Sequence, residues 1–358
     1  MKGFARSTET LHPALTLLLL TLLVVAGMCI GMFLAVSVVT ITYGVDLLRL
    51  PEVLASPARY TYGWAVLMWL QGLSLLAGFG AGAYFLPVLR GLKPADYFMP
   101  RRPTPGWWLL AAMVLMIVSM PALSGLVAWN ADAHLPSWLY DLEKGAREKE
   151  DQAQALTTFL TKFGTTTRFL VALLVVAVVP AIAEELTFRG VVLRQFSRWT
   201  NSLHWGVWLS AIVFSAIHMQ FFGFVPRMVL GVLLGYLFAW SGNILVPMAA
   251  HFAQNGFQLL LLFLQQRGTI SFDADANEPM PWPLMLLSLV LTLGLLYWLQ
   301  QQFAAHKAAT TEAHVLTGHG VQVRTQADAP LPAPPVAGHT LTSHGIETPP
   351  EASGRITT

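Results

Sequence analysis

Three groups of polar side chains interrupt apolar stretches, and their types and spacing could hydrolyse a peptide bond. The adjacent carboxylates Glu184 and Glu185 end one apolar run. His218 ends a second run, and His251 and Asn255 lie four residues apart inside a third. A carboxylate can act as a general base, an imidazole can position the attacking water, and an amide can donate to an oxyanion. These residues therefore form the inventory of a hydrolase.

The first group also contains a partner for one of its acids. Arg189 follows Glu185 by four residues, the favourable order for an ion pair on a helix. Because consecutive helix residues point about 100° apart, Glu184 and Glu185 cannot share one role. We therefore expect Arg189 to neutralise Glu185 and leave Glu184 to act as the base. The alternative is a helix end that has reached the lipid headgroups, where all three charges are solvated.

The histidine groups have structural alternatives of their own. His218 could simply pack at the membrane interface, and His251 and Asn255, which share a helix face, could form an interhelical hydrogen-bonded pair. Strong hydrogen-bonding groups inside a bilayer are costly unless they meet partners, so we expect the three groups to converge. The expected helices place His218 towards the opposite membrane face from Glu184 and His251. Convergence therefore requires short or tilted helices.

Other hydrolytic chemistries receive less support. No Gly-x-Ser-x-Gly turn is present for a serine hydrolase, and no His-Glu-x-x-His helix for the usual zinc protease. The single cysteine, Cys29, excludes an internal disulfide and a cysteine-based zinc site. Glu184, His218 and His251 could still supply three ligands of an open zinc site. We favour a water activated by Glu184, which needs no cofactor, over zinc.

Composition sets the fold class. The 358 residues are 55% hydrophobic and 11% charged, whereas soluble domains carry roughly a quarter charged residues. The net charge of +2 and the lack of a basic aromatic cluster argue against a nucleic-acid partner. We predict an all-α, polytopic membrane bundle in the lipid bilayer. Its eight expected helices cover about residues 14–42, 62–89, 107–127, 169–183, 205–220, 225–240, 244–264 and 283–303.

The polar interruptions predict the domain organisation and the orientation. The Lys and Arg residues between 90 and 106 indicate a cytoplasmic loop, so residues 130–167 should form an extracytoplasmic helix or cap. Small residues at 78–83 suit close helix packing. The expected divisions are 1–61, an N-terminal helix and link; 62–168, accessory helices and the amphipathic segment; 169–265, the catalytic core; 266–306, the last loop and helix; and 307–358, a disordered tail.

The motifs resemble those of a known family, the CPBP proteins. This family contains the CAAX prenyl endopeptidases, the bacteriocin-processing and immunity proteins, and the lysostaphin-resistance-like proteins. The resemblance covers about residues 169–264 and leaves out the first helices and the tail. It rests on three motifs in order: Glu184-Glu185-x-x-x-Arg189, Phe214-x-x-x-His218 and His251-x-x-x-Asn255.

The resemblance implies an eight-helix intramembrane endopeptidase of the plasma membrane, with a cavity open to the cytoplasmic side. Its substrate would be a membrane-associated protein or peptide. A non-catalytic immunity or scaffold protein on the same fold is the alternative. A transporter would show repeated halves with broken helices, and neither is found. The implied roles are activation of water by Glu184, help in holding it from His218, oxyanion stabilisation by His251 and Asn255, and orientation of the site by Glu185 and Arg189.

Overall fold

The structure, a computed structural model, describes residues 11–99, 105–271 and 279–318. Within these ranges every regular element is helical, and no strand is present. This confirms the predicted all-α, polytopic membrane bundle. Six helical stretches in these ranges are long and apolar enough to cross a membrane: Pro13–Tyr43, Gly63–Leu89, Trp107–Ala131, Thr166–Trp199, Phe224–Ser241 and Trp282–Ala308.

The two other expected membrane helices are present but differ from these six. Helix α11 (Leu203–Ala216) has 14 residues, and at 1.5 Å per residue it is roughly 21 Å long. It is therefore too short to cross a hydrocarbon core of about 30 Å. Helix α13 (Leu245–Gln266) has 22 residues, but its histidine and amide side chains make it less apolar than the six. Helix α13 has many buried residues and suits an inner position, whereas α11 exposes an apolar face that includes Trp205, Trp208 and Ile212.

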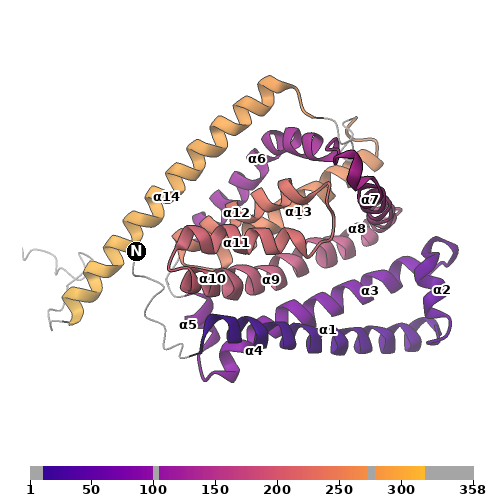
Figure 1. Cartoon of the computed structure of the whole chain (residues 1–358), viewed down its shortest axis with the longest axis horizontal. Coiled ribbons are helices and arrows are strands. Elements are labelled where there is room, and N and C mark those ends of the chain that lie inside the picture. Colours follow the sequence, from indigo (N-terminus) through magenta and orange to yellow (C-terminus); the bar gives the residue numbers. More distant parts are fainter. Residues whose placement is uncertain (1–10, 100–104, 272–278, 319–358) are drawn as a thin grey trace, which may run out of the picture. The chain divides into compact units, whose positions relative to one another are not determined.

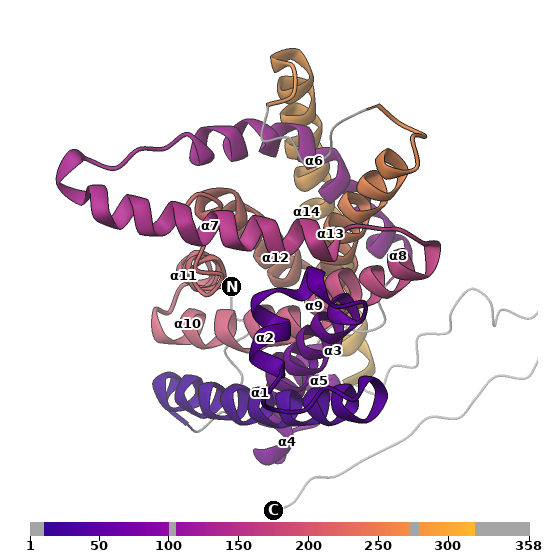
Figure 2. The same ribbon diagram turned by 90° about the vertical axis from the view of Figure 1, so that its right-hand side faces the viewer.

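The first two membrane helices form a closely packed pair, and Figures 1 and 2 both show α1 (Pro13–Tyr43) beside α3 (Gly63–Leu75). Glycines make this approach possible. A Cβ added at Gly27 would lie 2.2 Å from the carbonyl oxygen of Ala77, which leaves no room for a side chain. The predicted role of small residues at 78–83 is confirmed at Gly78, which faces α1 in the same way. The remaining elements of this region are α2 (Leu50–Ala55), a π-helical segment (Leu76–Ala81), α4 (Gly82–Leu89) and α5 (Pro94–Phe98).

The long helical stretch Thr166–Trp199 carries the first motif. It alternates between α-helical and π-helical winding, and π-helical turns are frequent at functional sites. Glu184 and Glu185 end an α-helical segment just where a π-helical one begins. The successive segments are α8 (Thr166–Ala172), a π-helical segment (Leu173–Val178), α9 (Val179–Glu185), a second π-helical segment (Leu186–Val192) and α10 (Leu193–Trp199).

Three more helices surround the motif-bearing ones. Helix α7 (Tyr140–Leu160) lies in the region where a cap was expected. The side chain of Trp64 in α3 donates to the Leu160 carbonyl oxygen over 2.8 Å, which fixes the end of α7. Helices α6 (Trp107–Ala131) and α12 (Phe224–Ser241) complete this set.

The last helix, α14 (Trp282–Gly318), packs on α6 through contacts between aromatic rings. The ring centroids of Trp108 and Phe303 are 4.5 Å apart, edge to face. The helix continues beyond Lys307, so the predicted start of the tail at that residue is too early. The described helices form one compact unit that ends at Ala308, and a second unit begins at Ala309. The rest of the predicted tail, 319–358, lies outside the described residues.

Candidate active site

A buried ion pair lies at the centre of the motif residues. Nη1 of Arg189 donates to Oε1 of Glu185 over 2.6 Å, and Nδ1 of His251 donates to the same oxygen over 2.8 Å. Nη2 of Arg189 donates to the carbonyl oxygen of Gly231 in α12 over 3.2 Å. The side chains of Arg189 and Glu185 are 1% and 0% exposed. The predicted ion pair is confirmed, and it joins α9, α12 and α13 at one point.

Glu184 has a different environment from its neighbour. Its Oε2 lies 3.9 Å from Nε2 of His251, and its side chain is 12% exposed. The rest of the described chain makes no hydrogen bond to Glu184. The expectation that Glu184 lacks a local partner is therefore confirmed. The alternative of three solvated charges is wrong for Glu185 and Arg189, because both are buried.

The structure brings His218 and His251 to the same aromatic side chain, that of Phe214. The centroid of this ring lies 5.1 Å from that of His218 and 6.3 Å from that of His251. This is possible because α11 is short and ends before it could cross the membrane. Met219 follows with φ +54°, a left-handed conformation that turns the chain directly after His218. A short helix and a sharp turn thus place His218 beside Phe214, and the convergence of all three groups on one water molecule stays a prediction.

The hydrogen bonds of the two histidines fix how they present their rings. Nδ1 of His218 lies 2.8 Å from the carbonyl oxygen of Phe214, and Nδ1 of His251 lies 2.8 Å from the carboxylate of Glu185. Both partners are acceptors, so both Nδ1 atoms carry the proton. In the neutral rings Nε2 is then an acceptor, and Nε2 of His251 faces Glu184. Such a group of acceptors suits a water molecule held for deprotonation.

Three predicted zinc ligands do not gather in this arrangement. In the parts of the chain that the structure describes, no group of three or more His, Cys, Asp and Glu side chains is placed to hold a metal ion. Glu184 and His251 lie close together. His218 packs against the ring of Phe214, which in turn packs against His251.

Asn255 forms a hydrogen bond to the backbone of the helical stretch that carries Glu184. Its Nδ2 donates to the carbonyl oxygen of Val176 over 3.3 Å. Pro180, four residues after Val176, has no N–H, so it cannot make the usual helical bond to that carbonyl. Neighbouring side chains commonly satisfy a carbonyl that a proline frees in a membrane helix. One N–H of Asn255 is therefore already used in positioning the helix that carries Glu184.

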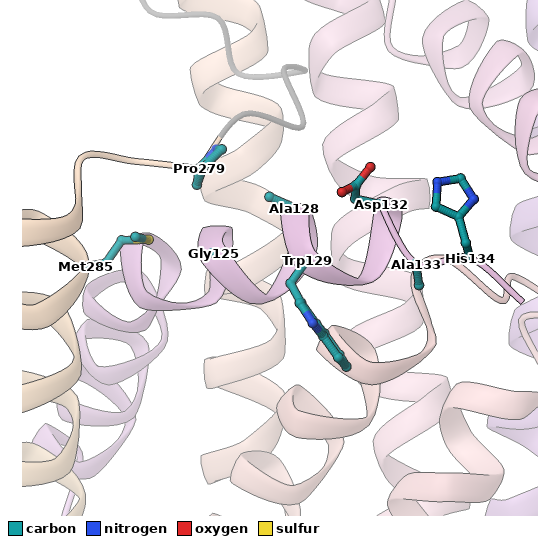
Figure 3. A pocket seen from close by; sticks show the side chains of 8 residues that line it. All are labelled: Gly125, Ala128, Trp129, Asp132, Ala133, His134, Pro279 and Met285. Carbon is teal, nitrogen blue, oxygen red and sulfur yellow. The ribbon is translucent and has the colours of Figure 1, made fainter.

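A pocket of about 830 Å³ opens elsewhere, at the C-terminal end of α6 and near the start of α14 (Figure 3). It shares no residue with the three motifs, so it is separate from the candidate active site. Its lining consists of Gly125, Ala128, Trp129, Asp132, Ala133, His134, Pro279 and Met285.

One charged residue at the site was missed by the sequence reasoning. Arg227 lies in the first turn of α12, and Gly231, four residues later in this helix, accepts from Arg189 of the first motif. A signal was present, because Arg227 is the single charged residue of the expected membrane helix at 225–240. Ionisable residues inside membrane helices are rare and usually functional.

Comparisons with known proteins find similarity over the part of the chain that carries the three motifs. Residues 166–257 match the family described as type II CAAX prenyl endopeptidase, Rce1-like, and this range contains all three motifs. "Uncharacterized protein YpbD" of Bacillus subtilis (strain 168) is 27% identical over 186 residues, which cover 51% of this chain and 80% of the relative. No solved structure matches the chain significantly. The motif-bearing core, residues 166–257, is therefore similar to the type II CAAX prenyl endopeptidases described as Rce1-like.

Proposed function

We propose that this chain is an intramembrane endopeptidase that hydrolyses a peptide bond in a membrane-associated protein or peptide. The observation that carries the proposal is the contrast between two adjacent acids. Glu185 is locked by Arg189 and His251, whereas Glu184 faces Nε2 of His251 at 3.9 Å without a hydrogen bond to the described residues. A carboxylate that is not neutralised, beside a fixed imidazole, suits a general base.

The reaction follows from this arrangement. Glu184 takes a proton from a water molecule while the water oxygen attacks the carbonyl carbon of the substrate. The carbonyl π electrons move to oxygen and form a tetrahedral oxyanion. The C–N bond then breaks as Glu184 passes the proton to the departing amine. The products are a carboxylic acid and an amine, and transfer of the acid proton to the amine leaves a carboxylate and an ammonium group. Glu184 recovers its starting form.

We assign the surrounding residues by their hydrogen bonds. In their neutral forms His251 and His218 present Nε2 as an acceptor, so they hold the water rather than donate to the oxyanion. Glu185 and Arg189 fix the ring of His251. Asn255 positions the helix and retains a second N–H for the substrate. The resemblance instead gives His251 and Asn255 the oxyanion, so the two assignments differ for His251.

The cellular setting is part of the proposal. The chain is a multi-pass integral membrane protein with six described stretches able to cross a bilayer. We place it in the plasma membrane, because its relative comes from a bacterium, where multi-pass helical proteins lie in the cytoplasmic membrane. The substrate would reach the site from the same bilayer.

Peptide release by the purified protein in detergent tests the proposal. Glu184→Gln keeps the size of the side chain and removes the base, so kcat should fall by about 10²- to 10⁴-fold. Glu148→Gln, an exposed acid of α7, is the matched control and should leave kcat unchanged. A chelator arm, with zinc added back, decides between a metal and a water activated by Glu184 alone.

The same experiment addresses the scaffold alternative. If the wild type cleaves no peptide of a broad library, and Glu184→Gln retains the cellular phenotype of the wild type, the endopeptidase proposal is wrong. A non-catalytic immunity or scaffold protein would then account for the fold.

A further inference from the structure

The guanidinium of Arg227 is only partly satisfied. Its Nη2 donates to Oε1 of Gln220 over 2.8 Å. Its Nη1 is buried and has no hydrogen-bond partner among the described residues. A buried charged donor without a partner is costly, so such an atom needs a reason to be there. Gly231, one turn further along α12, accepts from Arg189, so this part of α12 lies beside the motif residues.

Several contacts hold this guanidinium in one position. Nε2 of Gln220, the residue that accepts from Arg227, donates to Glu150 of α7 over 3.2 Å. Gly223 lies directly against the guanidinium, and a Cβ added there would be 3.1 Å from Nη2. The side chain is therefore fixed from two directions before any substrate arrives.

The turn that precedes Arg227 is fixed as well. Oδ1 of Asn130 accepts from the backbone N–H of Val225 over 2.8 Å, and Nδ2 of Asn130 donates to the carbonyl of Phe221 over 3.4 Å. The hydroxyl of Ser215 donates to the carbonyl of Phe224 over 2.6 Å. Rigid support of this kind is what an electrostatic catalytic group requires, because it avoids reorganisation during the reaction.

The other residues of the site leave a role for such a donor. The histidines present acceptors, and one N–H of Asn255 is bonded to Val176. The oxyanion formed by attack on the substrate carbonyl needs a donor, and a fixed positive charge in a dry site stabilises it strongly. We propose that Nη1 of Arg227 donates to this oxyanion, an inference that rests on the proposed endopeptidase function.

Kinetics of Arg227→Gln in the purified full-length protein test this role. An interaction made only in the transition state affects kcat and leaves KM little changed. Loss of one oxyanion donor typically costs about 10²- to 10³-fold in kcat, and we expect a loss of that size. Arg227→Lys keeps the charge and should lose less. Arg267→Gln, at an exposed arginine at the end of α13, is the control and should behave as wild type.

Two further measurements separate this role from a structural one. A peptide phosphonate, which mimics the tetrahedral oxyanion, should lose affinity for Arg227→Gln by the same factor as kcat/KM. An uncleaved substrate peptide should bind wild type and variant equally. Gly223→Ala should reduce kcat slightly without raising KM, since its new methyl group would lie 3.1 Å from Nη2 and the guanidinium must shift by a few tenths of an ångström. Thermal unfolding establishes whether each variant is folded. If Arg227→Gln does not fold, the kinetics of Arg227→Lys test the oxyanion role in its place.

The outcomes are distinct. If the wild type cleaves nothing, the endopeptidase proposal fails, and the role of Arg227 fails with it. If the wild type is active but Arg227→Gln raises KM at constant kcat, Arg227 anchors the substrate and the oxyanion role is wrong. Unchanged kcat and unchanged phosphonate affinity would also overturn it.

Discussion

Pro180 lacks a backbone N–H in the helix that carries the catalytic candidates, and Asn255 adds a side-chain donor to the same stretch. The Val176 carbonyl, which would accept from residue 180 in a regular α-helix, accepts from Nδ2 of Asn255 in α13. At the scale of single residues, the third motif is therefore tied to the first through the backbone as well as through His251 and Glu185. The proline and the asparagine are expected to act as a pair.

A double-mutant cycle tests this pair. Asn255→Ala should destabilise the protein by about 0.6–1.7 kcal/mol, the range measured for interhelical hydrogen bonds in membranes. Pro180→Ala restores a backbone N–H that can bond to Val176, so Asn255→Ala should cost less in that background. The measurement is unfolding of the purified protein in mixed micelles. Equal costs in both backgrounds would show that the two residues are independent.

At the scale of elements, the first turns of α7 hold the chain that enters it. The carboxylate of Glu143 accepts from the backbone N–H of Leu135 over 2.8 Å, and from Arg147 and His134. The hydrogen bond from Leu135, and then those from Arg147 and His134, lower the pKa of Glu143 from 4.5 to about 2. The ionised carboxylate thus clamps residues 133–135 to the helix.

The sign of the pH dependence follows from this lowered pKa. The clamp is fully present above the unfolded pKa of 4.5 and is lost as the pH falls towards about 2. Protection of the Leu135 amide from hydrogen exchange, corrected for intrinsic rates, should therefore decline across that window. Glu143→Gln should abolish the decline, and Glu148→Gln should preserve it. If the decline in protection persists in Glu143→Gln, another titrating group causes it and the prediction is wrong.

At the scale of the whole molecule, two expectations about orientation conflict. The hydrogen-bonded path from Arg227 through Gln220 reaches Glu150 of α7. The basic residues between 90 and 106 precede the opposite end of α6. If the loop at 90–106 is cytoplasmic, α7 is extracytoplasmic, and the polar path leads away from the cytoplasm. An extracytoplasmic α7 connected to the site therefore conflicts with a site that opens to the cytoplasm.

We predict that the site opens on the side of α7. Single cysteines in a Cys29→Ser background test this with a membrane-impermeant thiol reagent on intact cells. Glu148→Cys in α7 and Met219→Cys beside His218, where Met219 is 76% exposed, should be labelled from the same side. Thr200→Cys, at the end of α10, should be labelled only from the other side. Joint labelling of Met219→Cys and Thr200→Cys would contradict the prediction.

The sequence by itself determined the features that depend on local chain geometry. The apolar runs are long enough to predict the helices, and all eight expected helices are present. The Glu185–Arg189 pair was predictable because a spacing of four residues brings side chains together on one helix. The three motifs also sufficed to indicate the family, because they preserve residue types and order.

Only the tertiary structure decided which groups meet across helices. The shortness of α11 brings His218 to the ring of Phe214, which also packs against His251. The crossing of α13 over the motif helix pairs Asn255 with the carbonyl of Val176. The position of Arg227 depends on a turn held by α6 and α7. These contacts join residues far apart in the chain, and helix lengths and crossings set them. A helical periodicity specifies the face of a side chain, but its partner depends on how the helices pack.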